Sequence, residues 1–149
     1  MEKKLKMLYV EDMQKCYDKT AEVFRNSVEI DWRKSTLEAI DAIYSHPEKY
    51  DFAVFDVNLF YNPNKTDKEQ SKEGLALIWM LREELKARGI NSNLPIFCVS
   101  SDGENKPLSI ENGATAFLWK KQFWEDKKNT LENLVAQTVF LKENGRQKR

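Results

Sequence analysis

The sequence predicts a doubly wound α/β fold, in which helices cover both faces of a five-stranded parallel sheet. Short apolar segments alternate along the chain with longer segments whose apolar residues recur at helical spacing. Three of the short segments, 4–10, 51–56 and 94–100, are largely continuous apolar runs, which is typical of central strands covered on both faces. The length of 149 residues fits one domain, and no internal repeat divides it.

In the first half of the chain, strands are expected at 4–10, 28–32 and 51–56, with a helix in each interval. The helix within 13–28 is indicated by residues at helical spacing, namely Cys16, Thr20, Val23 and Phe24. The next helix follows the capping-box pattern of Ser35 and Glu38 and ends before Pro47. Its expected apolar face consists of Leu37, Ile40, Ile43 and Tyr44.

The second half continues the alternation after a polar segment at about 60–73, which is expected to be an extended loop. A helix is expected at 74–89 with Gly89 at its C-terminus, and strands are expected at 94–100 and 114–119. The apolar residues of that helix are Leu75, Ile78, Met80, Leu81 and Leu85. Segment 108–112 allows a short helix at most. The last helix is expected at about 122–143, before a basic tail at 144–149.

Composition argues against several classes of protein. Lys and Arg together number 24, as do Asp and Glu, so the chain has no net charge to hold nucleic acid or a membrane surface. No segment has the length and apolarity of a membrane helix or the pattern of a signal peptide. Cys16 and Cys98 lie among apolar residues and are expected to be small core side chains. We therefore expect a cytoplasmic protein.

Polar side chains follow four of the expected strands at their carboxyl ends, where ligands of open α/β sheets bind. The first strand is followed by Glu11 and Asp12, the third ends in Asp56, the fourth ends in Ser100, and the fifth is followed by Lys120. Taken singly, each of them also fits a helix cap, a turn or an exposed residue. Together, three converging carboxylates call for a divalent cation such as Mg²⁺, and a hydroxyl and an ammonium suit phosphoryl oxygens. The set predicts Mg²⁺-assisted phosphoryl transfer to a carboxylate.

The chain resembles the receiver domains of two-component response regulators, of the CheY-like type. The matching stretches are LYVED, YDFAVFDVNL, LPIFCVSSDG and GATAFLWKKQF, in the family's order and at roughly its spacing. The resemblance covers nearly the whole chain and implies a flavodoxin-like sheet with strand order 2-1-3-4-5. It also implies a single receiver domain over 1–149.

The resemblance implies a role for each strand-end residue. Asp56 would accept the phosphoryl group, with Ser100 and Lys120 contacting its oxygens. Mg²⁺ or Mn²⁺ would be held by Glu11, Asp12, Asp56 and the backbone carbonyl of Asn58.

Further positions match residues that act in switching and turnover in the family. Phe117 matches the aromatic residue that swings inward with Ser100. Asn58 and Asp102 match positions that tune dephosphorylation. A histidine kinase or histidine phosphotransfer protein would supply the phosphoryl group, and an unidentified protein would take the output.

Three features depart from the family pattern. Lys121 stands where the family usually has proline after a cis bond, which leaves the geometry of Lys120 open. The loop at 60–73 is longer than usual and is either a tolerated insertion or a means of gating or docking. The segment between Ser100 and Gly113 is short, so its helix is expected to be stunted. Nearby, Trp119, Phe123 and Trp124 are either a docking patch or packing between the last strand and helix.

Two other functions compete with a phosphorylated receiver, which would not itself turn over an external substrate. One is a pseudo-receiver that binds partners without phosphorylation, but it has no need of Asp12, Asp56, Ser100 and Lys120 together. The other is a phosphatase of the haloacid-dehalogenase type, whose second acid two residues after the nucleophile is here Asn58. No glycine-rich loop follows a strand, so nucleotide binding is not indicated.

Overall fold

The computed structural model describes residues 4–57, 73–90, 93–100 and 105–125, together with Asn133 and Ala136. In chain order the elements are β1 (Leu5–Val10), α1 (Gln14–Phe24), β2 (Val28–Arg33), α2 (Thr36–Ser45), β3 (Phe52–Asp56), α4 (Glu73–Arg88), β4 (Ile96–Ser100), α5 (Asn105–Glu111), β5 (Ala116–Trp119) and α6 (Lys120–Glu125). Each expected strand is present, and strand and helix alternate as predicted.

The five strands form one parallel sheet in the order β2-β1-β3-β4-β5, which confirms the predicted fold and strand order. The register places Val10 opposite Phe55, Asp56 opposite Val99, and Ser100 opposite Trp119. Because all strands run the same way, the polar residues that follow them meet at one edge of the sheet.

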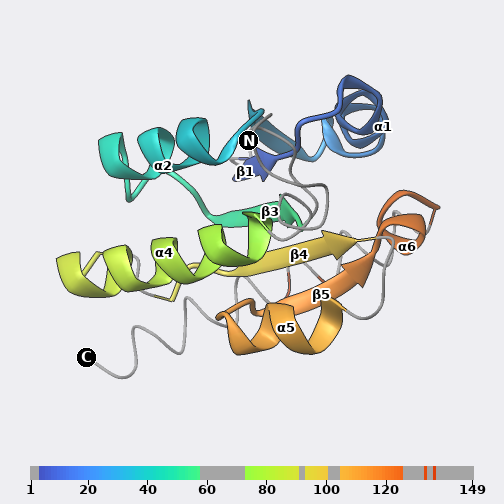
Figure 1. The fold of residues 1–149 in the computed structure, drawn as a ribbon. Helices are drawn as coiled ribbons and strands as arrows, with labels where there is room; N and C mark the ends of the chain where they lie inside the picture. Colours follow the sequence, from blue (N-terminus) through green and yellow to red (C-terminus); the bar gives the residue numbers. More distant parts are fainter. Residues whose placement is uncertain are drawn as a thin grey trace.

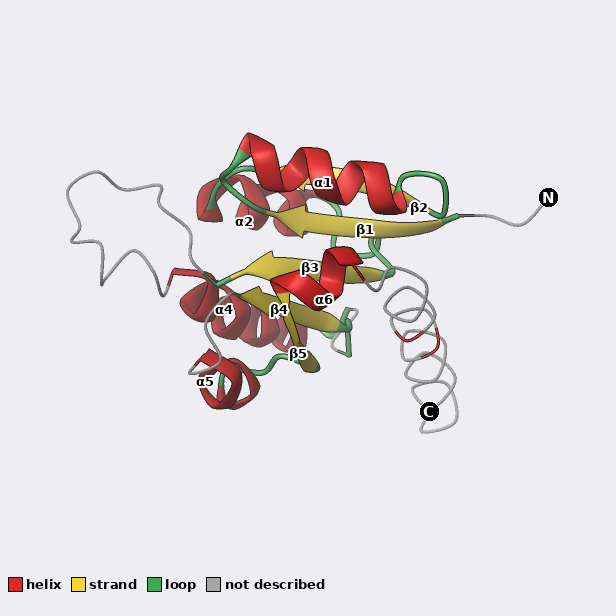
Figure 2. Cartoon of the chain, turned by 90° about the vertical axis from the view of Figure 1, so that its right-hand side faces the viewer, coloured by secondary structure: helices red, strands yellow, loops and turns green. Residues whose placement is uncertain are grey.

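Helices cover both faces of the sheet (Figures 1 and 2). Alternate strand residues face α2, α4 and α5 on one side, including Leu8, Val10, Ala53, Phe55, Ile96 and Cys98. The other set faces α1 and α6, including Met7, Tyr9, Phe52, Val54, Phe97 and Val99. Burial of both sets explains why β1, β3 and β4 are apolar without alternation.

Local sequence signals set two helix ends. Ser35 Oγ accepts a hydrogen bond from the Glu38 backbone N–H at 3.2 Å, so Ser35 is the N-cap of α2 as predicted. At the end of α4, Gly89 has φ of 65°, and the amides of Gly89 and Ile90 donate to the carbonyls of Lys86 and Leu85. This is a Schellman turn, in which glycine adopts the left-handed backbone conformation at little cost.

The predicted apolar faces of two helices are partly wrong. In α2 the sheet contacts Ala39, Ala42 and Ile43, whereas Leu37 and Tyr44 are exposed. The small alanines let α2 lie close to the sheet, so the helix is rotated relative to the predicted face. In α4, Met80 is exposed because Leu77, Ile78, Leu81 and Leu85 already fill the interface with the sheet.

The last two helices also differ from expectation. Helix α5 begins at Asn105, earlier than predicted, but it has only seven residues, as a stunted helix should. Helix α6 begins at Lys120, immediately after β5, rather than near 122. The Lys120–Lys121 peptide is trans, so the chain passes from strand to helix without a loop. Most of the expected helix at 122–143 and the tail at 144–149 lie outside the described residues, although Asn133 and Ala136 are helical.

None of the helices in the described part of the chain is both long enough and apolar enough to cross a membrane.

Candidate functional site

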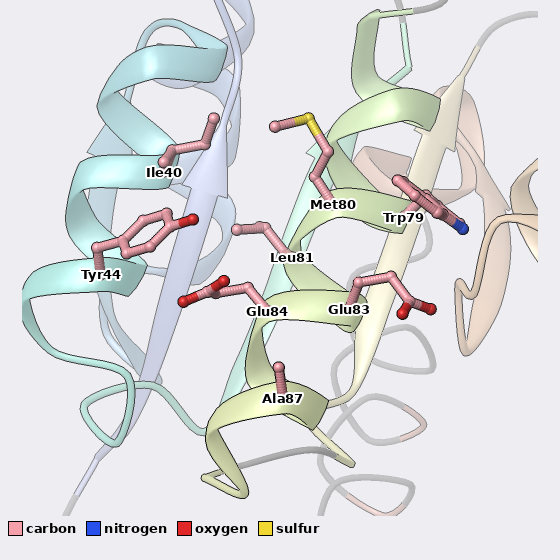
Figure 3. A pocket seen from close by; sticks show the side chains of 8 residues that line it. All are labelled: Ile40, Tyr44, Trp79, Met80, Leu81, Glu83, Glu84 and Ala87. Carbon is pink, nitrogen blue, oxygen red and sulfur yellow. The ribbon is translucent and has the colours of Figure 1, made fainter.

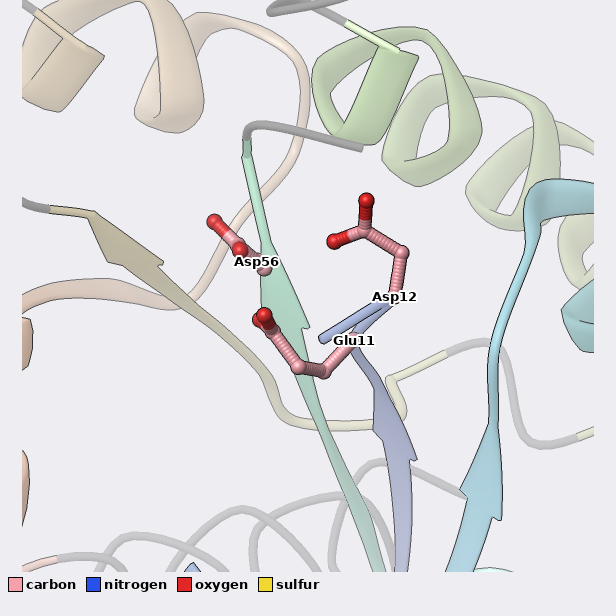
Figure 4. Close-up of side chains that lie close together, drawn as sticks. All are labelled: Glu11, Asp12 and Asp56. Atoms are coloured by element: carbon pink, nitrogen blue, oxygen red, sulfur yellow. The ribbon is translucent and has the colours of Figure 1, made fainter. Parts of the chain in front are cut away.

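Three carboxyl groups meet at the carboxyl edge of the sheet (Figure 4). Glu11 and Asp12 follow β1, and Asp56 ends β3. One oxygen from each lies within 4.8 Å of the others. Glu11 and Asp56 are buried, whereas Asp12 is partly exposed. Such an arrangement crowds negative charge in a place with little water.

Glu11 is affected both by burial and by this crowding. Its side chain is fully buried, and neither of its carboxyl oxygens has a hydrogen-bond partner among the described residues. Burial, and then the neighbouring Asp56, raise the pKa of Glu11 to about 9, although Lys120 lowers it in part. In the absence of a cation, therefore, Glu11 holds a proton at neutral pH.

Lys120 supplies the positive charge of the site. Its Nζ lies 3.1 Å from Asp56 Oδ2, 3.9 Å from Glu11 Oε2 and 3.8 Å from Cys16 Sγ. Burial lowers the pKa of Lys120, but the charges of Asp56 and Glu11 outweigh it and raise the pKa above its usual value. The ammonium therefore stays charged and is directed at Asp56, even though the following peptide is trans.

The first turn of α6 packs against α1 and forms a hydrogen bond with it, and these contacts position Lys120. Phe123 is fully buried, with its ring centroid 4.9 Å from that of Phe24. Trp124 Nε1 donates a hydrogen bond to Thr20 Oγ1 at 3.0 Å, and this oxygen also lies 2.9 Å from the Cys16 carbonyl. Phe123 and Trp124 are therefore packing residues, whereas Trp119 is exposed.

Residues of β2 form hydrogen bonds with the backbone at Glu11, next to Asp12. The Trp32 indole donates to the Glu11 carbonyl at 2.7 Å, and the Glu11 amide donates to the Arg33 carbonyl at 3.1 Å. The Trp32 ring stacks on Tyr17 of α1, with centroids 4.1 Å apart. The backbone at Glu11 is thus fixed independently of any ion.

The start of α4 packs directly on the backbone that follows Asp56. The Gly74 amide donates to the Val57 carbonyl at 3.1 Å. A Cβ at Gly74 would lie 2.3 Å from the Asp56 carbonyl oxygen and 2.7 Å from Val57 Cα. Only glycine therefore fits here without moving the end of β3.

Comparisons with solved structures give consistent matches. A Chloroflexus aurantiacus J-10-fl protein described as a response regulator is 22% identical, over 92% of this chain and 99% of that chain, with a TM-score of 0.71. A CheY-like response regulator receiver domain protein from Methanospirillum hungatei JF-1 is 20% identical, over 95% and 99%, with a TM-score of 0.70. A chain of the CheX–CheY–BeF₃–Mg²⁺ complex from Borrelia burgdorferi is 18% identical, over 91% and 89%, with a TM-score of 0.68.

The chain has the fold of a CheY-like receiver domain. No protein-family model matches the sequence, and no curated protein sequence matches it. At these identities the likeness establishes the receiver fold, and the chemistry has to be argued from the residues.

Two further residues that the sequence analysis expected to act at the site, Ser100 and Phe117, lie on β4 and β5. Ser100 is buried at the end of β4, one residue beyond the position opposite Asp56. Phe117 is partly buried opposite Cys98 and meets Trp119 edge to face, with centroids 5.8 Å apart. Asn58, Asp102 and most of the loop at 60–73 lie outside the described residues, so their roles remain predictions.

Several residues that shape the site were not predicted from the sequence to do so, or were predicted only to be core residues. Cys16 and Thr20 carry signals of core packing only. In the structure, however, Cys16 contacts Lys120 and Thr20 accepts a hydrogen bond from Trp124. Trp32 and Gly74 carry no local signal that separates them from ordinary strand and loop residues. Their roles follow from contacts between distant segments.

Proposed function

We propose that the chain is a phospho-accepting receiver in which Asp56 takes up a phosphoryl group. The observation that carries the proposal is the Lys120 ammonium, which lies 3.1 Å from Asp56 Oδ2 beside two further carboxyl groups. A carboxylate at the end of a rigid central strand, paired with a fixed ammonium, is well placed to react with an electrophilic phosphorus.

In the proposed reaction, an oxygen of Asp56 forms a bond to phosphorus while the bond from phosphorus to the donor's leaving group breaks. Lys120 then pairs with a phosphoryl oxygen in place of the Asp56 oxygen it now contacts, and the Ser100 hydroxyl donates to another. A shift of Ser100 towards the phosphoryl group, followed by Phe117, would change the surface near β5.

The acidic residues fit a divalent cation. Three crowded carboxyl groups, one of them buried with no hydrogen-bond partner among the described residues, are hard oxygen ligands in need of positive charge. Glu11, Asp12 and Asp56, with the Asn58 carbonyl, would hold Mg²⁺ or Mn²⁺. When bound, the ion would offset the charge of the carboxylates and of the incoming phosphoryl oxygens.

The proposal also covers the partner proteins and the cellular location of the receiver. A histidine kinase or histidine phosphotransfer protein in the cytoplasm would supply the phosphoryl group, and a second protein would bind the phosphorylated form. The Borrelia burgdorferi complex, which joins CheY to CheX, supports a signalling protein as partner. The chain would act as an acceptor with its own phosphorylation and dephosphorylation chemistry and would not turn over an external substrate.

The proposal is tested by incubation with Mg²⁺ and acetyl phosphate, followed by intact-mass measurement. We expect one added phosphoryl group, which is lost in Asp56→Asn and upon removal of Mg²⁺ with EDTA. Asp51→Asn provides a matched control, because Asp51 lies at the opposite end of β3. If no donor yields an adduct and Mg²⁺ does not bind, the proposal is wrong and an unphosphorylated interaction module of the same fold takes its place.

A further inference from the structure

Helices α2 and α4 carry most of the large apolar side chains that are exposed in the described part of the chain. Seven large apolar side chains are exposed in the described part of the chain, and four of them belong to these two helices: Leu37, Tyr44, Trp79 and Met80. Tyr44 is 49% exposed and Trp79 is 55% exposed. Contiguous apolar surface of this kind marks interaction sites more often than single exposed residues do.

Three of these side chains, those of Tyr44, Trp79 and Met80, border a groove between the helices (Figure 3). Ile40 and Tyr44 of α2 face Met80 and Leu81 of α4, and the hollow has a volume of about 370 Å³. On the opposite side of α4, a second hollow of about 480 Å³ is also lined by Trp79. Trp79 therefore stands on a ridge between two hollows, where a bound partner can contact it from either side.

The rim of the groove is acidic. Glu83 and Glu84 line it from α4, and no basic residue of the described chain lines it. Helix α2 has no basic residue, whereas α4 has Lys86 and Arg88 in its last turn. Arg88 donates to the Tyr44 carbonyl and lies 4.0 Å from Glu84, so it offsets part of the charge of Glu84. The lining of the groove therefore carries negative charge, mainly from Glu83, although the whole chain has no net charge.

The negative charge of the groove favours some binding partners over others. A two-fold contact with a second copy would set the acidic rim against itself, because such an interface joins the same surface of both subunits. Nucleic acid and anionic lipid would also be repelled. An amphipathic helix with apolar anchors flanked by Lys or Arg fits both the shape of the groove and its charge.

We propose that the α2–α4 groove binds a basic amphipathic helix of a partner protein, with Trp79 as its central contact. The apolar side of the partner helix would enter between Tyr44 and Met80, and its basic residues would face Glu83 and Glu84. The groove lies apart from the acidic edge of the sheet, so this inference does not depend on phosphoryl transfer.

The test uses a fluorescently labelled peptide of about 16 residues, made of Leu, Lys and Ala with Leu at helical spacing, and anisotropy measurements. A matched peptide has Glu in place of Lys. We expect the Lys peptide to bind, and Trp79→Ala to weaken its affinity at least about tenfold, because tryptophan dominates such contacts. Glu83→Gln combined with Glu84→Gln should weaken binding and reduce its dependence on salt.

Trp119→Ala is the control, because Trp119 is 44% exposed but lies on β5, away from the groove. It should leave peptide binding unchanged. Met80→Gln provides a second test if Trp79→Ala lowers the melting temperature. Equal binding of both peptides, or binding unaffected by Trp79→Ala and Met80→Gln, would overturn the proposal. So would light scattering that shows a dimer abolished by Trp79→Ala, since the occupant would then be a second copy.

Discussion

Trp124 and Thr20 form a hydrogen bond of 3.0 Å between α6 and α1, although 104 positions separate them in the sequence. The same Thr20 oxygen contacts the carbonyl of Cys16, whose sulfur lies beside Lys120. The orientation of the site's ammonium therefore depends on how α6 is seated against α1.

Trp124→Phe tests this dependence, because it removes the indole donor while keeping an aromatic ring. We expect a loss of about 1 kcal/mol in the free energy of unfolding and slower phosphorylation of Asp56, since Lys120 is held less firmly. The measurement is the rate of adduct formation with acetyl phosphate and Mg²⁺, together with urea denaturation. Thr20→Ser keeps the hydroxyl and should retain the rate. An unchanged rate in a destabilised Trp124→Phe would mean that the bond supports the fold alone.

Much of the fold was predictable because its signals are local. Continuous apolar runs identified β1, β3 and β4, and parallel strands necessarily bring Asp12, Asp56 and Lys120 to one edge. The buried face of α2 was not predictable by the same means. Two sets of its residues, one with Ala39 and Ala42 and the other with Leu37 and Tyr44, have helical spacing, and only packing on the sheet selects between them. Contacts such as that of Trp124 with Thr20 have no local pattern.

Glu11→Gln is expected to separate metal binding from folding. Burial and Asp56 hold the pKa of Glu11 at about 9, so an uncharged glutamine resembles its state at neutral pH, and stability without metal should change little. Wild-type protein should gain about 1.4 kcal/mol of stability at a Mg²⁺ concentration ten times its Kd. The variant should lose most of that gain, as measured by melting with and without Mg²⁺. An equal Mg²⁺ effect in both proteins would exclude Glu11 from the metal site.

Asp31→Asn is expected to destabilise the protein in a pH-dependent way. Burial raises the pKa of Asp31, but hydrogen bonds from Arg33, Tyr50 and Lys49 outweigh burial and lower it to about 2. Because the folded-state pKa lies below the unfolded one, this stabilisation is complete above about pH 5 and is lost as the pH falls towards 2.

Allowing for partial exposure of the pair to solvent, the contribution at pH 7 is about 1–2 kcal/mol, and about half of it should remain near pH 3. Urea denaturation of wild type and Asp31→Asn at pH 7, 4 and 3 measures this difference. Asp18→Asn on the exposed side of α1 is the control and should give only a small difference at pH 7. A difference for Asp31→Asn that does not shrink with acid would show that packing, rather than charge, holds Asp31.

Gly74→Ala is expected to be the most damaging of the single-methyl changes near the site. The added Cβ would lie 2.3 Å from the Asp56 carbonyl oxygen, and that oxygen belongs to a buried strand end that cannot move away without breaking β3 pairing. We expect a loss of about 2–3 kcal/mol or more, with slower phosphorylation because Asp56 is displaced. Gly89→Ala is the matched control: its Cβ meets no atom within 4 Å, so it should cost only about 1 kcal/mol for its left-handed backbone. Comparison of the two by urea denaturation separates steric contact from backbone strain, and equal losses would mean that α4 shifts to accommodate the methyl group.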